Sequence, residues 1–176
     1  MGIYANIELM SDSDGGDLDV KRAMVLAAGY GKRLEPLTHI LPKPLLPVCN
    51  RPVVEHTLRL LNESGFREVV VNLHHKGQAI VDRLGDGSRF GVNITYSPEE
   101  ELLGTAGGIK AAERHLGDGP FLIINSDILI NIDLSEVWGF HREKNGLATL
   151  VLRREEAQTY GAIKIDSSGR VVQFLS

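Results

Sequence analysis

Short apolar runs alternate with segments of helical periodicity along most of this chain, and that alternation constrains its fold more than any other feature. Uninterrupted apolar runs of four to six residues are typical of strands that are buried on both faces. Strands that alternate with helices form a parallel sheet with helices on both sides. The sequence therefore predicts an α/β, Rossmann-like domain with a mainly parallel sheet. Strands are expected at 23–28, 68–73, 92–96, 121–124, 147–152, 162–165 and 171–174, and helices at 52–64, 78–84, 105–116 and 134–145.

The expected sheet also predicts where a ligand would bind. In open sheets of this kind, ligands occupy the crevice beyond the carboxyl ends of the strands. We therefore expect the site in the loops that follow Ala28, Leu73, Tyr96 and Ile124.

The first twenty residues differ from the rest in charge. They carry five acidic residues and no Lys or Arg, whereas the whole chain has a net charge of −4, so the remainder is nearly neutral. A polar, acidic segment of this kind is typical of a flexible leader. We expect a leader at 1–20 and one domain at 21–176, in which any polyanionic ligand is held by local groups and not by a global field.

Composition excludes several classes of protein. The chain has no basic, aromatic-laced stripe of the kind that binds nucleic acid, and no apolar run long enough to cross a bilayer. Its single cysteine, Cys49, cannot form an intrachain disulfide, which fits a cytoplasmic protein. Because Cys49 lies in an apolar stretch, we expect its thiol to be buried.

The loop after the first expected strand combines two glycines with two cations. Gly29 and Gly31 let the backbone approach a phosphate chain, and Lys32 and Arg33 add positive charge beside it. Arg33 stands where a P-loop requires Ser or Thr, and Leu34 where a dinucleotide fingerprint requires a third glycine. This argues against a nicotinamide-dependent oxidoreductase. On its own, the loop is equally compatible with an ordinary glycine turn.

A third cation follows in the segment Pro42-Lys43-Pro44. Each proline fixes its own φ and restricts the residue before it, so we expect a stiff, extended backbone around Lys43. A preorganised cation of this kind stabilises charge that develops on a phosphate during transfer. The alternative is a proline-rich loop whose lysine is solvated.

These residues resemble the signature of the sugar-1-phosphate nucleotidylyltransferases, which have the nucleotide-diphospho-sugar transferase type of fold. Mannose-1-phosphate guanylyltransferases and N-acetylmuramate-1-phosphate uridylyltransferases are the most similar branches. The resemblance covers about residues 21–174 and rests on Leu26-Ala27-Ala28-Gly29-Tyr30-Gly31-Lys32-Arg33-Leu34-Glu35-Pro36-Leu37-Thr38, Pro42-Lys43-Pro44-Leu45-Leu46-Pro47-Val48, Asn50-Arg51-Pro52, Asn72-Leu73-His74-His75, Leu103-Gly104-Thr105-Ala106-Gly107-Gly108, Asn125-Ser126-Asp127 and Tyr160-Gly161.

The resemblance implies a role for each matching position. The glycine loop would wrap the triphosphate of an NTP, with Arg33 and Lys43 as catalytic cations at the α-phosphorus. Gly161 would lie near the sugar, and Asp127 would bind Mg²⁺. Nucleotide-binding residues would be Ala28, Gly29, Gly31, Lys32, Arg33, Glu99, Gly104 and Thr105.

The residues themselves leave some of these roles open. Asp127 lies just past the carboxyl end of the buried strand expected at 121–124, where Mg²⁺ bound to phosphates would find a carboxylate. An Asp that caps a turn is the alternative. Glu99 could accept a base N–H, or belong to a solvated acidic loop. His74 and His75 are adjacent, so on an extended strand they would point to opposite faces. For this reason we expect a structural or loop role for both.

The chain departs from the family pattern at its end. A second metal-binding aspartate and a Glu-Lys pair that holds the sugar phosphate would lie beyond Gly161, and Ser176 falls about where the pair should begin. We expect a domain that is incomplete at its C-terminus, with homo-oligomerisation left open.

The predicted function is Mg²⁺-dependent transfer of a nucleoside monophosphate from an NTP, GTP or UTP being favoured, to a sugar 1-phosphate. The products are an NDP-sugar and pyrophosphate. The alternative is a non-catalytic nucleotide-binding module of the same fold, with a regulatory or scaffolding role.

Overall fold

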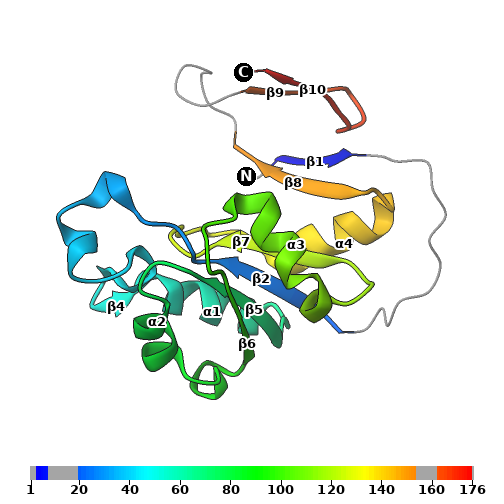
Figure 1. Ribbon diagram of the computed structural model, residues 1–176. Helices are drawn as coiled ribbons and strands as arrows, with labels where there is room; N and C mark the ends of the chain where they lie inside the picture. Colours follow the sequence, from blue (N-terminus) through cyan, green and yellow to red (C-terminus); the bar gives the residue numbers. More distant parts are fainter. Residues whose placement is uncertain (1–2, 8–19, 154–161, 176) are drawn as a thin grey trace. The chain divides into compact units, whose positions relative to one another are not determined.

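The computed structural model describes residues 3–7, 20–153 and 162–175 (Figure 1), which form two compact units. The larger unit contains residues 20–130, and the smaller contains 3–7, 131–153 and 162–175. The boundary lies inside the region that the sequence analysis treats as one domain. Within the described residues, no helix combines the length and apolar character that crossing a bilayer requires.

The larger unit is built on the predicted parallel sheet. Its strands lie in the order β6-β5-β2-β7, and every neighbouring pair is parallel. At the carboxyl edge, Leu26 of β2 is level with both Asn72 of β5 and Asn125 of β7. The strand bounds are β2 Arg22–Leu26, β5 Glu68–Leu73, β6 Asn93–Pro98 and β7 Phe121–Asn125.

Helices cover both faces of this sheet, as predicted. The chain steps outward from β2 to β5 to β6 and then returns across the sheet to β7. Since parallel crossovers are right-handed, the first two connecting helices lie on one face and the third on the other. Figure 1 shows the third, α3, in front of the strands. The helices are α1 Val53–Glu63, α2 Gly77–Leu84 and α3 Gly104–Leu116.

Apolar side chains on both sides of β2 form the core. Met24 and Val70 pack with Ala112 and Leu116 of α3, and all four are buried. On the opposite face of the sheet, the alternate residues of β2 and β5 are buried too. Val54, Leu58 and Leu61 of α1 are buried as well. A strand that is covered on both faces needs an unbroken apolar run, which is why the sequence predicted β2 and β5 well.

A small hairpin before α1 corrects one prediction. β3 (Pro47–Val48) and β4 (Arg51–Pro52) are joined by Cys49 and Asn50, whose φ angles of 50° and 62° form a left-handed two-residue turn. Cys49 is exposed, so the prediction of a buried thiol was wrong. The apolar residues around it mark the strands, whereas the cysteine itself occupies the turn.

The smaller unit contains α4 (Leu134–Lys144) and two antiparallel strand pairs. β1 (Ile3–Ile7) pairs with β8 (Ala148–Leu152), so part of the segment expected as a flexible leader is a strand. β9 (Ala162–Ile165) pairs with β10 (Val171–Leu175). In the turn between them, hydrogen bonds from the Ser168 side chain and the backbone of Arg170 lower the pKa of Asp166 to about 2.

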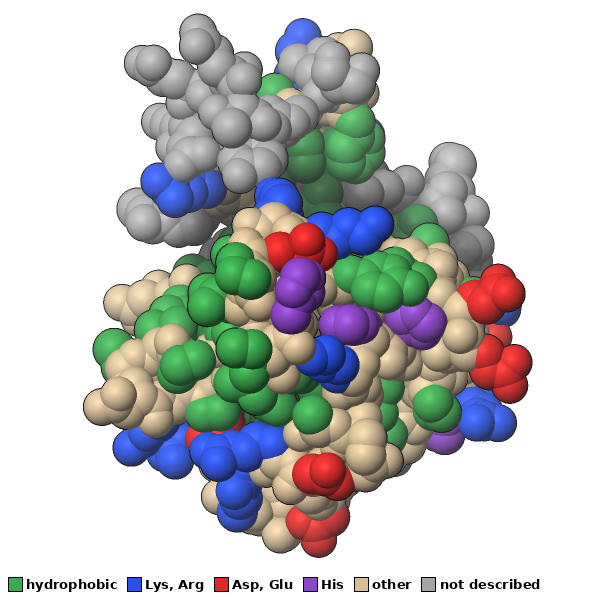
Figure 2. Space-filling model, turned by 60° about the vertical axis from the view of Figure 1, so that its left-hand side comes forward, with side chains coloured by type: hydrophobic (Ala, Val, Ile, Leu, Met, Phe, Trp, Pro, Cys, Tyr) green, Lys and Arg blue, Asp and Glu red, His purple; other side chains and the backbone are tan. Residues whose placement is uncertain are grey.

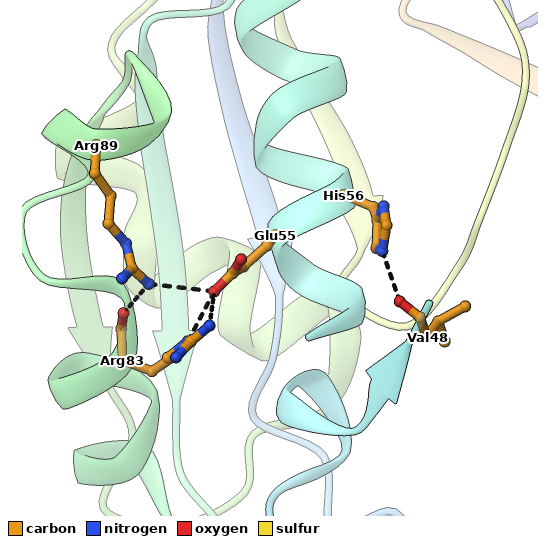
Figure 3. Close-up of polar contacts among 5 residues, drawn as sticks. All are labelled: Val48, Glu55, His56, Arg83 and Arg89. Carbon is orange, nitrogen blue, oxygen red and sulfur yellow. Dashed lines mark hydrogen bonds and ion pairs between the residues drawn. The ribbon is translucent and has the colours of Figure 1, made fainter. Parts of the chain in front are cut away.

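A buried carboxylate links three elements of the larger unit (Figure 3). Glu55 of α1 is 5% exposed, and its Oε1 accepts a hydrogen bond from Nε of Arg83 in α2 at 2.7 Å. Arg89, in the short 3-10 helix Ser88–Phe90, donates to the same oxygen at 3.2 Å and to the Arg83 carbonyl. On the other side of α1, His56 bonds the Val48 carbonyl at 3.0 Å and holds the hairpin against the helix.

Glu55→Gln should lower the free energy of unfolding by about 2 kcal/mol, because it removes the charge of a buried carboxylate that accepts hydrogen bonds from two arginines. The matched control is Glu113→Gln, because Glu113 forms an exposed ion pair with Lys110 and should change stability by less than about 0.5 kcal/mol. Urea unfolding followed by circular dichroism measures both. Equal shifts in the two variants would contradict the structural role of Glu55.

Candidate functional site

A cavity of ≈ 370 Å³ opens in the larger unit beyond the carboxyl ends of β2 and β7, where the strand order reverses. That position is where an open α/β sheet binds its ligand. The cavity brings together most of the predicted site residues, namely Ala28, Gly29, Gly31, Lys32, Arg33, Lys43, Gly104, Thr105 and Asp127. The role of these residues in binding a ligand stays a prediction. They converge from separate loops that lie up to about a hundred residues apart in the sequence.

The two glycines of the first loop have different surroundings. Gly31 has a φ of 68°, and a Cβ there would lie 2.8 Å from Thr38 Cγ2 and 3.1 Å from Lys43 Cβ. Gly29 has no neighbouring atom within 4 Å of such a Cβ. The fold therefore requires glycine at position 31, whereas at position 29 the missing side chain leaves open space on the cavity wall.

Lys43 is aimed by a short helical turn. It begins the 3-10 helix Lys43–Leu45, so the prediction of an extended backbone at Lys43 was wrong. Pro42 and Leu46, on either side of the turn, are extended, and the Leu45 N–H closes the turn by donating to the Pro42 carbonyl at 2.8 Å. Pro44 and Leu45 are buried, which anchors the turn. The backbone beside Lys43 is therefore fixed, as expected, although by a different conformation.

The Lys43 ammonium forms an ion pair with the Asp127 carboxylate across the cavity. Each side chain is 27% exposed, so both charges remain accessible to a ligand. Among the described residues, no three His, Cys, Asp or Glu side chains cluster as a metal site. A cation at Asp127 would thus need oxygen atoms from a ligand or water, which is how Mg²⁺ is usually held beside phosphates. The donor set fits Mg²⁺ with a nucleotide and not a protein-only metal cage.

Asn72 is a site residue that the sequence analysis did not select. It lines the cavity and is 3% exposed. Its Oδ1 accepts the Ala27 N–H, and its Nδ2 donates to Glu99 Oε1, both at 2.7 Å. The available signal was a polar residue that ends the apolar run of β5.

Glu99 is engaged with the protein and is not among the residues that line the cavity. It is 7% exposed, and its Oε2 accepts the Leu103 N–H at 3.0 Å. Glu100 and Glu101 are exposed, as the alternative of a solvated acidic loop expects, but Glu99 is buried. Its carboxylate fixes the segment that leads into α3.

His74 and His75 both approach Tyr30, whose ring centroid lies 5.4 Å and 5.2 Å from theirs. The expectation that they point to opposite faces was wrong, because β5 ends at Leu73 and both residues lie in the following turn. The predicted loop role holds. Figure 2 shows histidine side chains gathered beside lysine and arginine side chains on one face of the molecule. Gly161, the predicted sugar-side residue, lies outside the described residues.

Comparison with known proteins decides the family. Residues 22–175 match the family model for nucleotidyl transferases. The chain belongs to this family. It is 50% identical over 115 residues to N-acetylmuramate alpha-1-phosphate uridylyltransferase of Neisseria meningitidis, a match that covers 65% of this chain and 50% of that protein. It is 39% identical over 149 residues to mannose-1-phosphate guanyltransferase 2 of Candida glabrata, covering 82% and 41%.

The fold agrees with that assignment. The structure of HddC from Yersinia pseudotuberculosis complexed with GMP-PN superposes with a TM-score of 0.72 at 22% identity, covering 89% of this chain and 69% of that one. This nucleotidyl transferase chain spans half or less of the length of the Neisseria meningitidis and Candida glabrata relatives.

Gly31→Ala should destabilise the larger unit by about 2 kcal/mol, because it combines a left-handed φ with contacts to Thr38 and Lys43. Gly29→Ala is the matched control and should change stability by no more than about 0.5 kcal/mol. Urea unfolding of both variants makes the comparison. If Gly29→Ala were as destabilising as Gly31→Ala, the open space assigned to position 29 would be refuted.

Proposed function

We propose that this chain forms the nucleotide-binding part of a cytoplasmic sugar-1-phosphate nucleotidylyltransferase. The enzyme transfers a nucleoside monophosphate from an NTP to a sugar 1-phosphate and releases pyrophosphate. The observation that carries the proposal is the cavity at the carboxyl edge of the sheet, where a glycine loop, Arg33, Lys43 and Asp127 converge. Membership of the nucleotidyl transferase family supports it, as do the activities named for the two relatives.

The reaction joins an oxygen of the sugar phosphate to the α-phosphorus of the NTP. As that bond forms, the bond from the α-phosphorus to the bridging oxygen of the β-phosphate breaks, and pyrophosphate leaves with the electron pair. Little covalent chemistry falls to the protein, so catalysis consists mainly of positioning and electrostatic stabilisation. Arg33 and Lys43 would stabilise the negative charge that shifts at the α-phosphate, while backbone N–H groups of the glycine loop hold the triphosphate.

Mg²⁺ fits this site through Asp127. When bound, the ion would polarise phosphate oxygens and offset their charge. In the structure Lys43 neutralises Asp127, so a cation at that carboxylate would compete with Lys43. The phosphates of the nucleotide would then be the new partners of the lysine. Lys43 thereby keeps the carboxylate compensated before the nucleotide arrives.

The places proposed for the base and the sugar follow from residue positions. Gly104 and Thr105 line the cavity at the start of α3, and a Cβ at Gly104 would meet no atom within 4 Å, which leaves room for a base and ribose. The relatives are named for uridylyl and guanylyl transfer, which favours UTP or GTP. Glu99 remains a candidate acceptor for a base N–H, since a carboxylate can accept about four hydrogen bonds and two are described. Gly161 remains the candidate on the sugar side.

Asp127→Asn should abolish the part of NTP affinity that depends on Mg²⁺, a loss of about tenfold or more. Binding of GTP and UTP in EDTA should remain, because the glycine loop and Arg33 are intact. Isothermal titration calorimetry with and without Mg²⁺ measures the difference. Asp118→Asn, at an exposed position outside the cavity lining, makes the same charge change and should behave as wild type. A Mg²⁺ effect of wild-type size in Asp127→Asn would remove Asp127 from the metal site.

Arg33→Ala and Lys43→Ala should each lower kcat more than they raise KM for the NTP, because their charges act mainly in the transition state. Pyrophosphate release with GTP or UTP and a panel of sugar 1-phosphates provides the assay. Lys110→Ala, which removes an exposed cation paired with Glu113, is the control. A change in KM alone would mean that these residues bind the ground state and the transition state equally. Nucleotide binding without any pyrophosphate release, even by the complete gene product, would instead indicate a non-catalytic nucleotide-binding module.

A further inference from the structure

His74 joins the two loops that flank the cavity, although it is not one of the residues that line it. Its Nε2 lies 3.0 Å from the hydroxyl of Tyr30, between the two glycines of the first loop. Its Nδ1 lies 3.0 Å from the carbonyl oxygen of Glu99, in the loop that leads to α3. One imidazole ring therefore spans the gap between the phosphate-side loop and the base-side loop.

The chemistry of the two partners sets the direction of both hydrogen bonds. A carbonyl oxygen can only accept, so the hydrogen bond to Glu99 requires the proton on Nδ1 of His74. In the neutral ring, Nε2 is then an acceptor, and the Tyr30 hydroxyl donates to it. The link thus runs from the Tyr30 hydroxyl through His74 to the Glu99 carbonyl, with one tautomer of the histidine.

Packing holds the tyrosine in place for this link. The Tyr30 ring meets His74 edge to face at 90°, and His75 lies against it at a tilt of 49°. The Lys32 ammonium lies 5.6 Å from the centroid of the same ring. Because Tyr30 stands between Gly29 and Gly31, fixing its ring also restrains the glycine loop, which would otherwise be the most permissive backbone in the site.

A second, buried link runs parallel to the first and ends on the same residue. Ala27 donates to Asn72, Asn72 donates to Glu99, and Glu99 accepts the Leu103 N–H just before Gly104. Glu99 is therefore held by its side chain through Asn72 and by its backbone through His74. Both links connect the glycine loop and the residue pair before it to the segment that leads into α3.

We propose that His74 is a positioning residue that sets the separation between the glycine loop and the 99–104 loop, so that the triphosphate and the base of one nucleotide are held together. The inference rests on the proposed function. Two half-sites at a fixed separation bind a linked ligand more tightly than two loops that must be ordered on binding. The link should matter for the intact nucleotide and not for either half of it.

The test uses Tyr30→Phe, which removes the hydroxyl donor and keeps the ring. In Tyr30→Phe the Kd for GTP or UTP should rise about three- to tenfold, the size of one lost hydrogen bond. The Kd values for the free nucleoside and for inorganic tripolyphosphate, measured by NMR titration, should stay within about twofold. The double variant Tyr30→Phe, His74→Ala should be no weaker than His74→Ala alone, because both changes break the same link.

Tyr96→Phe is the matched control, since it removes a hydroxyl that donates to the Gly85 carbonyl at 2.6 Å, and neither residue lines the cavity. It should leave all three affinities unchanged. If the wild-type chain binds NTP and Tyr30→Phe binds it equally well, the role of His74 is refuted while the proposed function stands. Equal weakening of NTP, nucleoside and tripolyphosphate would also overturn it, because that result indicates general damage to the loops. If the wild-type chain binds no NTP, the proposed function and this inference both fall.

Discussion

The in-register pairing of β2 with its two neighbours is the constraint on which the candidate site depends. Leu26, Asn72 and Asn125 lie level with one another near the ends of their strands. The three loops that follow these strands therefore leave the sheet at one edge. A one-residue shift in the pairing register of a strand would displace the loop that follows it and would turn the strand's side chains to the opposite face. The apolar residues of β2 and β5, buried on both faces, fix that register. The core therefore sets the position of the cavity.

Among the described residues, positive charge is concentrated at the cavity, where Lys32, Arg33 and Lys43 line the wall with the single carboxylate Asp127. Outside its first twenty residues the chain is nearly neutral, so a triphosphate would meet no strong global attraction. Lys43 and Asp127 pair with each other, which leaves neither charge uncompensated in the free protein. Binding would exchange that pair for contacts with phosphate and metal. A site built in this way gains its selectivity from local geometry.

The sequence predicted the parallel sheet because strands buried on both faces must be continuously apolar, as Val69-Val70-Val71 shows. It also predicted that the glycine loop, Lys43 and Asp127 would meet, through the rule that ligands bind at the carboxyl edge. It did not predict the turn conformation of Lys43, because restrictions beside proline favour an extended backbone but do not enforce it. Cys49 was misplaced for a similar reason, since an apolar stretch can hide a two-residue turn.

Side-chain networks were the least predictable part of the site. Asn72 and Glu99 lie far apart in sequence, and nothing in either neighbourhood shows that they form a hydrogen bond. His74 and Tyr30 meet only because β5 ends one residue before the histidine. Such contacts depend on where a strand stops, and strand ends are set by tertiary packing as well as by local sequence.

The cavity at the carboxyl edge of the sheet should bind a nucleoside triphosphate. Heteronuclear NMR of the labelled chain, titrated with a non-hydrolysable NTP analogue and Mg²⁺, tests it residue by residue. We expect amide shift changes concentrated at Ala28–Arg33, Gly104, Thr105, Ser126 and Asp127, with the Cys49 turn unaffected. Shift changes that avoid these residues, or none at saturating nucleotide, would contradict it.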